Sequence, residues 1–579
     1  MTSDATQTNL LHLGVGEGSK VEHVKVSSDY LRGKIAEELQ KDSSHFSDEQ
    51  VNLMKFHGVY QQEDRDARQA RKAAHTEKAY QFMVRSRIPG GALTAEQYLV
   101  EDDLAGLYGN DTLRITTRQG IQLHGVLKGD LHSTIHGINE TLLSTLAACG
   151  DVNRNVMACP APIHDAAHRQ VQEVAQQIAM RLAPKSEAYH EIWIDGEKTH
   201  TVEAPEVVEP LYGPSYLPRK FKIGIAFPDD NCIDVYTQDI GLVALVEDEA
   251  LVGFTINIGG GMGMTHGKTE TYPRLATPLC DVTLEQVLPV VETIVTVQRD
   301  YGDRQNRKHA RMKYVVEERG IDWFRNEVEQ RLGYTLQLPG PTPVYDVQDH
   351  LGWHQQGNGQ WFVGLHVENG RVKDTATTRM RSGLHAIIEQ FHPGIRLTGQ
   401  QNILLTDIVE SQRAEIEHAL NSYGISTVPA EAGAYRFAMA CPALPTCGLA
   451  LAEAERALPA VMQEIDDALH AIGLGGEPLS VRMTGCPNGC ARPHMGDIGL
   501  VGRTKDIYNI YLGGDRANTR MSTIYQASVH VTNIAATLLP LFVLWRDERL
   551  PHETFGDFCY RIGNEQLQAR VQEQQLVSK

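Results

Sequence analysis

The chain lacks a long hydrophobic run. Its longest largely apolar stretch, Ile534–Trp545, has 12 residues and is interrupted by Pro540, whereas a bilayer-spanning helix needs roughly 20 apolar residues. Residues 1–4 are polar and acidic, without the basic start and apolar core of a secretory signal. These absences predict a cytoplasmic protein that has no membrane partner.

An excess of positive charge is also missing. The chain has 54 Lys and Arg against 73 Asp and Glu, which gives a formal net charge of −19. Such an acidic surface repels nucleic-acid phosphates and anionic membranes, so we expect neither as a partner. An anionic substrate would have to be held by positive charges that are gathered locally.

A complete dinucleotide-binding motif is absent as well. Gly259-Gly260-Gly261-Met262-Gly263 follows a strand-like run, but it does not have the G-x-G-x-x-G spacing, and no acidic ribose partner follows about 20 residues later. We interpret this segment as a tight turn. The sequence therefore gives no sign that the chain binds a nicotinamide cofactor itself.

An internal repeat is present and organises the whole chain. Leu113–Ile121 resembles Ile395–Ile403, and Met157–Ala161 recurs identically as Met439–Ala443, both 282 residues later. In the same order, the sequence DIGLV at 239–243 recurs at 497–501, 258 residues later. Chance similarity of strand-like sequence is the alternative, but three matches in one order favour a duplication.

Helix-like and strand-like segments interleave in both copies. The fold class that this predicts is α+β with pseudo-twofold symmetry. A site at the junction of the copies would be enclosed by both. We expect helices near 94–108, 165–183, 380–391 and 448–472, and strands at Phe221–Phe227, Leu251–Ile258 and Ile507–Leu512.

Four of the nine cysteines form two short pairs, Cys441-x5-Cys447 and Cys486-x3-Cys490. In a reducing cytosol a disulfide framework is not expected, and four thiolates suit a [4Fe–4S] cluster. Structural zinc is one alternative, although its paired cysteines usually stand two to four apart, and buried packing cysteines are another. Cys149, Cys232, Cys280 and Cys559 are interpreted as packing residues, and Cys159, the counterpart of Cys441, stays open.

These motifs resemble the family of sulfite and nitrite reductases. The resemblance rests on Ala440–Cys447 and Thr484–Cys490, and it extends through Asp29–Gly33, Phe56–Gln62 and Phe555–Phe558. It therefore covers nearly the whole chain. The N-terminal part is most similar to the haemoprotein subunits of NADPH-dependent sulfite reductases.

The resemblance implies one sirohaem and one [4Fe–4S] cluster, with Cys490 bridging the cluster to the haem iron. It also implies ferredoxin-like half-domains and two larger α/β cofactor-binding domains. Ala491-Arg492-Pro493-His494 departs from the family pattern, which leaves the packing beside the haem in doubt. The expected parts are an extension at 1–80 that docks the flavoprotein, half-domains at 81–148 and 346–428, a sirohaem and substrate domain at 149–345, and a cluster and sirohaem domain at 429–579.

A polar strand face is the first candidate for the haem carboxylates. Alternation along one strand would put Arg114, Thr116, Arg118, Gln122 and His124 on the same face, although a solvent-exposed edge is the alternative. The eight carboxylates of sirohaem need charge-assisted donors, for which Arg offers a planar fork. Further cofactor contacts are predicted for Arg219, Gln401, Asn402 and Asn488.

Four cations are predicted to form the catalytic anion pocket: Arg85, Arg154, Lys220 and Lys222. Lys220 and Lys222 stand two apart and so share one side of an extended segment, with Arg219 on the other. Each alone would more often be a solvated surface charge. In the resembling family these positions hold sulfite above the haem.

The resemblance implies that electrons come from a separate NADPH-oxidising flavoprotein with FAD and FMN. The expected activity is the six-electron reduction of sulfite to sulfide. The alternative is a ferredoxin-dependent sulfite or nitrite reductase, which uses the same cofactors. A metal-stabilised scaffold without enzymatic activity is a third reading, but it leaves the cation set without a role.

Overall fold

The computed structural model describes residues 18–185, 191–194, 197–201, 209–341, 344–427 and 433–577, with the side chains of 191–201 and 574–577 left aside. In these ranges no helix is both long enough and apolar enough to cross a membrane. The chain forms four five-stranded sheets and one two-stranded ribbon, β7 (Glu191–Ile194) with β8 (Glu197–Thr201).

The first half-domain is a sheet with the strand order β1-β2-β5-β4-β15. Helix α6 packs beside it and begins at a capping box, in which Thr94 and Gln97 satisfy each other's backbone N–H. Its elements are β1 (Val59–Glu63), β2 (Tyr80–Arg85), α6 (Ala95–Leu107), β4 (Leu113–Ile115), β5 (Ile121–Val126), α7 (Leu131–Glu140) and the visiting β15 (Arg371–Val372).

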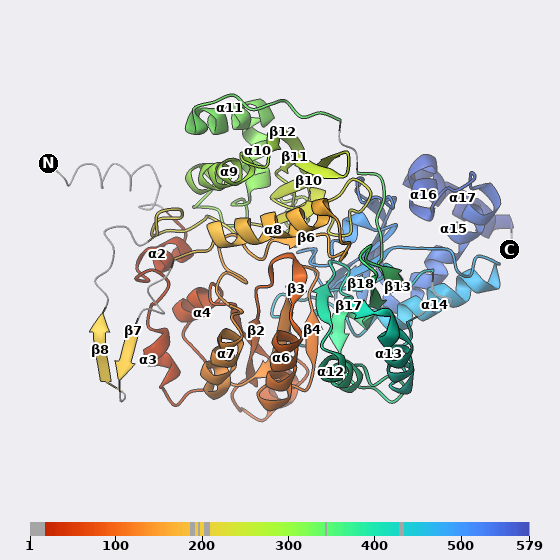
Figure 1. Cartoon of the computed structure of the whole chain (residues 1–579). Coiled ribbons are helices and arrows are strands. Elements are labelled where there is room, and N and C mark those ends of the chain that lie inside the picture. Colours follow the sequence, from red (N-terminus) through yellow and green to blue (C-terminus); the bar gives the residue numbers. More distant parts are fainter. Residues whose placement is uncertain are drawn as a thin grey trace.

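The second half-domain repeats this arrangement with the order β13-β14-β17-β16-β3. Each copy lends a two-residue strand to the other sheet, since β15 pairs with β4 and β3 pairs with β16. Helices α6 and α12 contact each other along the lower side of Figure 1. The second set is β3 (Ala92–Leu93), β13 (Gly352–Gln355), β14 (Gln360–Leu365), α12 (Met380–Phe391), β16 (Gly394–Leu397), β17 (Ile403–Val409) and α13 (Glu410–Ser422).

The first larger domain has the strand order β12-β11-β10-β9-β6. Strands β6, β9 and β10 run parallel, and β11 and β12 continue antiparallel. Helices α9, α10 and α11 gather at the top of Figure 1. The elements are β6 (Met157–Ala158), α8 (Ala166–Arg181), β9 (Ile223–Ala226), η5 (Val235–Thr237), β10 (Ile240–Glu247), β11 (Ala250–Ile258), β12 (Thr277–Thr283), α9 (Val287–Tyr301), α10 (Met312–Arg319) and α11 (Ile321–Leu332).

The second larger domain has the matching order β18-β19-β20-β21-β22, with the same switch from parallel to antiparallel pairing. Strand by strand it repeats the first, which confirms the duplicated α+β architecture. Its elements are β18 (Met439–Ala440), α14 (Leu458–Ala471), β19 (Val481–Thr484), η7 (Pro493–Met495), β20 (Ile498–Thr504), β21 (Ile507–Leu512), β22 (Thr523–His530), α15 (Ile534–Glu548), α16 (Phe555–Ile562) and α17 (Asn564–Val577).

The apolar residues form three cores. Each larger domain has its own, whereas the two half-domains share one, in which Leu123 and Val84 of the first copy join Leu405 and Ile387 of the second. Apolar spacing explains the helices that cover these cores: Val171, Val174 and Ile178 of α8 face the sheet at intervals of three and four. Neither half-domain can bury its apolar face alone.

The expected extension at 1–80 is wrong for the residues that the structure describes. β1 is the edge strand of the first sheet and the counterpart of β13. Ahead of it, α2 (Lys20–Val26) packs on the first larger domain, whereas α3 (Ile35–Leu39) and α4 (Asp48–Met54) contact both that domain and the core shared by the half-domains. In α2 the buried Lys25 ammonium pairs with Glu22 at 2.6 Å. The part of the expected extension that falls on residues 1–17 lies outside the described residues.

The predicted elements are otherwise close to the observed ones. α6 and α12 agree within two residues, and α8 lies inside its predicted range. α14 begins ten residues later than expected, because 448–457 form turns that carry Glu455 to the cysteine loops. The predicted continuous polar strand is wrong, since β4 and β5 are separated by a turn at 116–120 in which Gln119 has φ +53°.

Candidate functional site

The four paired cysteines leave two neighbouring strands at the same edge of the second larger sheet. Cys441 follows β18 directly, and Cys486 follows β19 after one residue. β18 and β19 are parallel, with Ala440 opposite Met483. Because the carboxyl ends of parallel strands share one edge, both cysteine loops meet there.

The thiols interact electrostatically as one group. Burial, and then the charge of Cys490, raise the pKa of Cys441 well above its ordinary value, and the same causes raise the pKa of Cys486 to about 11. Four adjacent thiolates therefore need a strong cationic centre. Four cysteines in two short loops are the usual ligand set of a [4Fe–4S] cluster.

Backbone and amide groups orient the sulfur atoms. The Gly485 N–H donates to Cys441 Sγ at 3.4 Å, and the Asn488 amide donates to Cys486 Sγ at 3.3 Å. Gly489 adopts φ +62°, which glycine tolerates without strain. At Gly485 the requirement is space, because an added Cβ would lie 2.5 Å from the Ala452 carbonyl oxygen.

A buried ion triad fixes the segment that precedes Cys441. Glu455 accepts from Arg114 Nε at 2.9 Å and from Arg371 Nε at 2.7 Å. Arg114 also donates to the Ala440 carbonyl at 2.8 Å, and the Glu455 backbone N–H donates to the Cys441 carbonyl. Burial raises the pKa of Glu455, but Arg371 and Arg114 outweigh it and hold that pKa at about 2. Arg114, predicted for a haem carboxylate, is thus committed to protein groups.

Arg65 was missed by the sequence analysis, which placed it in the expected extension at 1–80. Its guanidinium donates to the Cys447 carbonyl at 3.0 Å and to the Ala450 carbonyl at 2.7 Å. Its backbone N–H donates to the Pro445 carbonyl at 3.3 Å. The chain after β1 therefore clamps the first cysteine loop, and nothing in the local pattern of charges signalled this contact.

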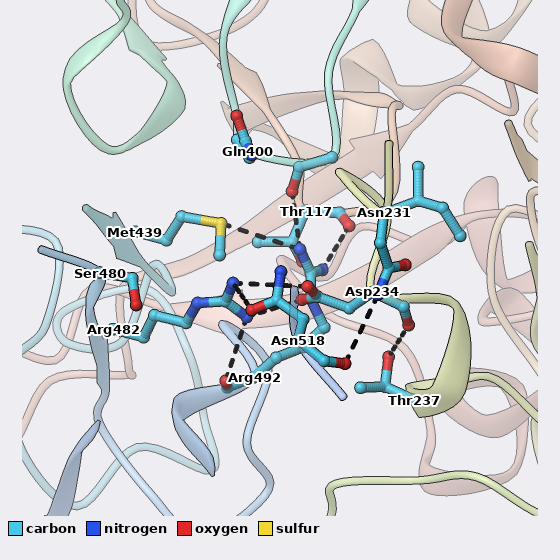
Figure 2. Close-up of polar contacts among 12 residues, drawn as sticks. Thr117, Asn231, Asp234, Thr237, Gln400, Met439, Ser480, Arg482, Arg492 and Asn518 are labelled. Carbon is cyan, nitrogen blue, oxygen red and sulfur yellow. Dashed lines mark hydrogen bonds and ion pairs between the residues drawn. The ribbon is translucent and has the colours of Figure 1, made fainter. Parts of the chain in front are cut away.

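Arg492, in the segment that departs from the family pattern, joins the two copies. Figure 2 shows it beside Arg482, with both guanidinium groups directed at Asp234 of the first copy. Arg492 also donates to the carbonyls of Thr117 at 2.8 Å and Gly399 at 2.9 Å. Thr117 and Gly399 are equivalent positions of the repeat, so Arg492 lies on the junction between the halves and fixes the chain two residues after Cys490.

A cavity of about 320 Å³ lies next to the second cysteine loop. Asn488 and Gly489 line it together with Arg219, Lys220 and Lys222. Arg219, predicted on the other side of the segment from Lys220 and Lys222, lines the same cavity as both lysines. In the described part of the chain neither lysine ammonium has a hydrogen-bond or ion-pair partner, so both are available to an anion.

The electrostatics of the two lysines follow from this crowding. Burial, and then Arg219 and Arg154, lower the pKa of Lys220 to about 7, while the charge of Cys490 acts in the opposite direction. Burial and the neighbouring Lys220 lower the pKa of Lys222 well below its ordinary value. Two partly buried, neighbouring cations without counter-ions are costly unless an anion is bound.

The other two predicted catalytic arginines converge on Cys149. Arg85 donates to its sulfur at 2.6 Å and Arg154 at 3.2 Å. Burial raises the pKa of the Cys149 thiol, but the two arginines outweigh this and lower it overall. Cys149, predicted as a packing residue, thus lies between the two arginines. Arg154 also interacts electrostatically with Cys490.

Part of the predicted polar face is formed by side chains from neighbouring strands, not by successive side chains of one strand. Gln122 of β5 lies opposite Arg85 of β2 and opposite Arg114 of β4, so the three side chains share a face. His124 is buried, and neither of its ring nitrogens has a partner among the described residues. Arg118, in the turn, donates to the Gln238 amide at 2.7 Å and to the Ile223 carbonyl at 3.1 Å, with its Nε unpaired.

Gln401 and Asn402 lie at the matching turn of the second copy. The Gln401 amide oxygen accepts from the Ala440 N–H at 3.2 Å, and its nitrogen donates to the Asn369 carbonyl. The Asn402 oxygen accepts from the Val367 N–H at 3.1 Å. The Gln401 amide is thus used by the protein and positions the strand that leads to Cys441, whereas the buried Asn402 Nδ2 has no partner among the described residues.

A second basic segment was also missed. Arg307 and Arg311 line the cavity, and Arg311 pairs with Asp239 at 2.8 Å. Lys313 donates to the Gly261 carbonyl at 3.1 Å and to the Gly263 carbonyl at 2.9 Å. It thereby holds the glycine turn against the cysteine loop. A cluster of basic residues in so acidic a chain could have indicated this segment: Arg307, Lys308, Arg311 and Lys313.

Two family models match the chain. The nitrite and sulphite reductase 4Fe-4S domain matches residues 173–336 and 432–579. The nitrite/sulfite reductase ferredoxin-like half domain matches residues 75–140 and 354–423. Each model matches twice, once in each copy, in agreement with the paired sheets.

Individual relatives cover almost the whole chain. The chain is 46% identical to a protein of Staphylococcus saprophyticus named sulfite reductase [NADPH] hemoprotein beta-component, over 94% of this chain and 95% of the relative. It is also 46% identical to a sulfite reductase [ferredoxin] of Synechococcus elongatus, over 95% and 90%. The solved structure of the Mycobacterium tuberculosis NirA protein superposes with a TM-score of 0.76 at 23% identity over 94% and 95%, which shows a shared fold.

Proposed function

Because the chain belongs to the nitrite and sulphite reductase family, we propose that it is the haem-bearing subunit of an assimilatory sulfite reductase that reduces sulfite to sulfide. The observation that carries the proposal is the cavity lined by Lys220 and Lys222 beside the cysteine loop. A small anion and a cluster-coupled cofactor would be placed side by side there. The proposal extends to a cytoplasmic location.

The donor set fits a [4Fe–4S] cluster and a sirohaem. Cys441, Cys447, Cys486 and Cys490 would hold the cluster, and Cys490 would also ligate the haem iron. When bound, the two groups supply the electron transfer and the sulfur coordination that the reaction requires. The unpaired nitrogens of His124 and the cations of the cavity suit the haem carboxylates.

Lys220 and Lys222 would bind the substrate anion. Their ammonium groups lack carboxylate partners in the described structure, so a sulfite dianion would supply the missing counter-charge. Burial strengthens this attraction. As each S–O bond breaks, negative charge grows on the departing oxygen, so the contact becomes stronger in the transition state than in the ground state.

The lysines are also the better proton donors. Reduction of one bisulfite to hydrogen sulfide takes up six electrons and seven protons and releases three waters. With the pKa of Lys220 at about 7, this group can give up and regain a proton near neutral pH. Arg85 and Arg154 stay charged throughout, so they would orient the anion instead of protonating it.

The electron donor is proposed to be an NADPH-oxidising flavoprotein with FAD and FMN. The name of the Staphylococcus saprophyticus relative supports this donor, and the incomplete motif at Gly259–Gly263 agrees with an external one. A ferredoxin is the second candidate donor, because the Synechococcus elongatus relative, named sulfite reductase [ferredoxin], is as similar to this chain as the Staphylococcus saprophyticus relative, at 46% identity. Of the docking arm expected at 1–80, residues 1–17 lie outside the described residues.

The test uses the purified holoprotein with reduced methyl viologen. We expect sulfide from sulfite, a larger kcat/KM for sulfite than for nitrite, and no NADPH oxidation by the chain alone. Addition of a flavoprotein reductase should confer NADPH-driven turnover. Ammonium from nitrite at a higher kcat/KM than sulfide from sulfite would contradict the proposed substrate, and turnover only with reduced ferredoxin would contradict the proposed donor.

Substitution of the lysines tests the pocket. Lys220→Met and Lys222→Met keep the aliphatic stem and remove one charge each. We expect sulfite turnover per haem to fall roughly 10²–10³-fold while the visible spectrum is retained. Lys268→Met, at an exposed lysine, is the matched control and should turn over normally. Near-normal rates in both cavity variants would remove these lysines from the active site.

A further inference from the structure

Four potential metal ligands meet in the first copy, away from the paired cysteines of the second. The ligand atoms of Cys159, Asp230, Cys232 and His350 all lie within 4.8 Å of one another. Asp230 Oδ2 is their common partner, at 2.9 Å from Cys159 Sγ, 3.4 Å from Cys232 Sγ and 2.9 Å from His350 Nε2. Each of these residues is at least nine-tenths buried.

Three separate segments contribute to this group. Cys159 follows β6, Asp230 and Cys232 lie in the turn between β9 and η5, and His350 ends the connection into the second copy. The other carboxylate oxygen of Asp230 accepts from the N–H groups of Cys232 at 3.2 Å and Gln348 at 3.1 Å. These bonds leave Oδ2 directed at the two thiols and the imidazole.

The internal repeat relates this group to the cluster cysteines. Cys159 is the counterpart of Cys441, 282 residues earlier, in the identical sequence Met-Ala-Cys-Pro-Ala. Cys232 is the counterpart of Cys490, 258 residues earlier, at the offset that aligns β9 with β19 and β10 with β20. The same two turns of the fold thus carry sulfur ligands in both copies, whereas Cys447 and Cys486 have no cysteine counterpart.

The group has the composition of a site for one small cation. Two thiols, one carboxylate and one imidazole are the ligand types that zinc takes in tetrahedral sites. Bond lengths of about 2.0–2.3 Å put neighbouring tetrahedral ligand atoms roughly 3.3–3.8 Å apart. The contacts with Asp230 Oδ2 are at or slightly below that range, so a shift of the carboxylate by a few tenths of an ångström would admit an ion.

An outer ring of contacts also resembles that of a metal site. His168 interacts with Cys159 and is oriented by Asp165, whose Oδ2 lies 2.8 Å from His168 Nδ1. The His168 ring stacks on Phe227 with centroids 4.2 Å apart. Partners of this kind, which fix a ligand and satisfy its lone pairs, accompany most metal ligands in proteins.

We propose that Cys159, Cys232, His350 and Asp230 bind one structural zinc ion in the first copy, in addition to the iron centres of the proposed function. The divalent charge would offset the thiolates and the carboxylate, which could not otherwise be ionised together in a dry interior. Its role is to tie the turns after β6 and β9 to the connection that enters the second copy. The proposal does not depend on the substrate of the enzyme.

Element-specific measurements on the holoprotein test this without removing a residue. The chain is produced in zinc-supplemented medium and purified without chelators, and metals are counted by mass spectrometry. We expect about one zinc per chain alongside the haem and cluster iron. Zinc K-edge absorption should show two sulfur ligands near 2.3 Å and two nitrogen or oxygen ligands near 2.0–2.2 Å. A zinc-free holoprotein that takes up no added Zn²⁺ would overturn the proposal.

Variants locate the ion. Cys232→Ser and His350→Gln should each weaken zinc binding by at least about tenfold, with cluster and haem iron unchanged per folded chain. Cys280→Ser, at a buried cysteine of β12 outside the group, is the matched control and should keep its zinc. Zinc that persists in both ligand variants, or an absorption spectrum with four sulfur ligands, would place the ion elsewhere and refute the assignment. If a variant does not fold, the wild-type spectrum still decides.

Discussion

Lys220 and Lys222 are partly buried beside other cations, without any carboxylate to neutralise them in the described structure. Such an arrangement destabilises the folded chain unless a bound anion compensates it. A purely structural role would favour paired charges, as at Arg311 and Asp239, 2.8 Å apart. At the scale of single residues, the unpaired lysines are therefore the most informative feature of the proposed active site.

The pKa of Lys220 predicts a pH dependence. The protonated lysine is the form that binds the anion and gives a proton, and burial with Arg219 and Arg154 lowers its pKa to about 7. kcat/KM reports the free enzyme, so it should fall as pH rises through about 7. Dye-driven turnover is measured against pH with sulfite and also with nitrite, because sulfite itself titrates near neutrality whereas nitrite does not.

Lys220→Arg is the control for this assignment. Arginine keeps its proton at all these pH values, so the alkaline fall with nitrite should disappear even if the overall rate is lower. An unchanged alkaline fall in Lys220→Arg would show that another group controls the profile.

At the scale of elements, ion pairs and arginine hydrogen bonds fix the loops that carry the cysteines. Glu455 joins β4, β15 and the segment that follows Cys447 to the backbone around Cys441. Arg65 holds the outer side of the same loop. These contacts come from parts of the chain far apart in sequence. They bind the proposed cluster loop to both half-domains before any metal is added.

Glu455→Gln should destabilise the holoprotein. The folded pKa of Glu455, about 2, is below its ordinary value because Arg371 and Arg114 outweigh burial. The carboxylate therefore contributes stability above pH 4.5, about 3 kcal/mol, and this is lost as pH falls from about 4.5 toward 2. We expect the urea midpoint at pH 7, followed by haem absorbance, to drop in Glu455→Gln.

Glu453→Gln provides the comparison. Glu453 pairs with Arg456, which is 47% exposed, so its loss should change stability by less than about 1 kcal/mol. The difference between the two variants should shrink between pH 4.5 and 2. Equal urea midpoints of the two variants at pH 7 would show that the triad does not stabilise the loop.

At the scale of the whole molecule, the two copies are interlocked. Each half-domain completes its sheet with a strand from the other, and the two share one core. Arg492 and Asp234 join the larger domains at the junction. The N-terminal residues from 18 onward are built into this body, since Arg304 and Lys25 both pair with the buried Glu22.

This arrangement predicts different outcomes for two truncations. Deletion of residues 2–17 should leave cofactor content and dye-driven sulfite turnover unchanged. Deletion of residues 2–60 removes the buried Leu31, Leu53 and Phe56 together with part of β1, so both dye-driven and NADPH-driven turnover should be lost. Cofactor content and both activities are measured per chain. Selective loss of NADPH-driven turnover in the longer deletion would mean that residues 18–60 form a docking arm after all.

The sequence by itself determined the duplication, the α+β class and the four paired cysteines. Identical local strings recur at constant offsets, and ligand spacing within a short loop is a local property, so no knowledge of the fold was needed. The expectation that Lys220 and Lys222 share one side of an extended segment is likewise local, because it follows from strand periodicity over two residues.

Only the tertiary structure decided which polar side chains remain available for ligands. Arg114, Arg118 and Gln401 look from the sequence like free donors, but partners up to several hundred residues away occupy them. From the sequence, Cys232 looks like a packing residue and the role of Cys159 stays open, until the fold places both beside Asp230 and His350. A local pattern can state what a side chain offers, whereas its partner is set by the packing of distant segments.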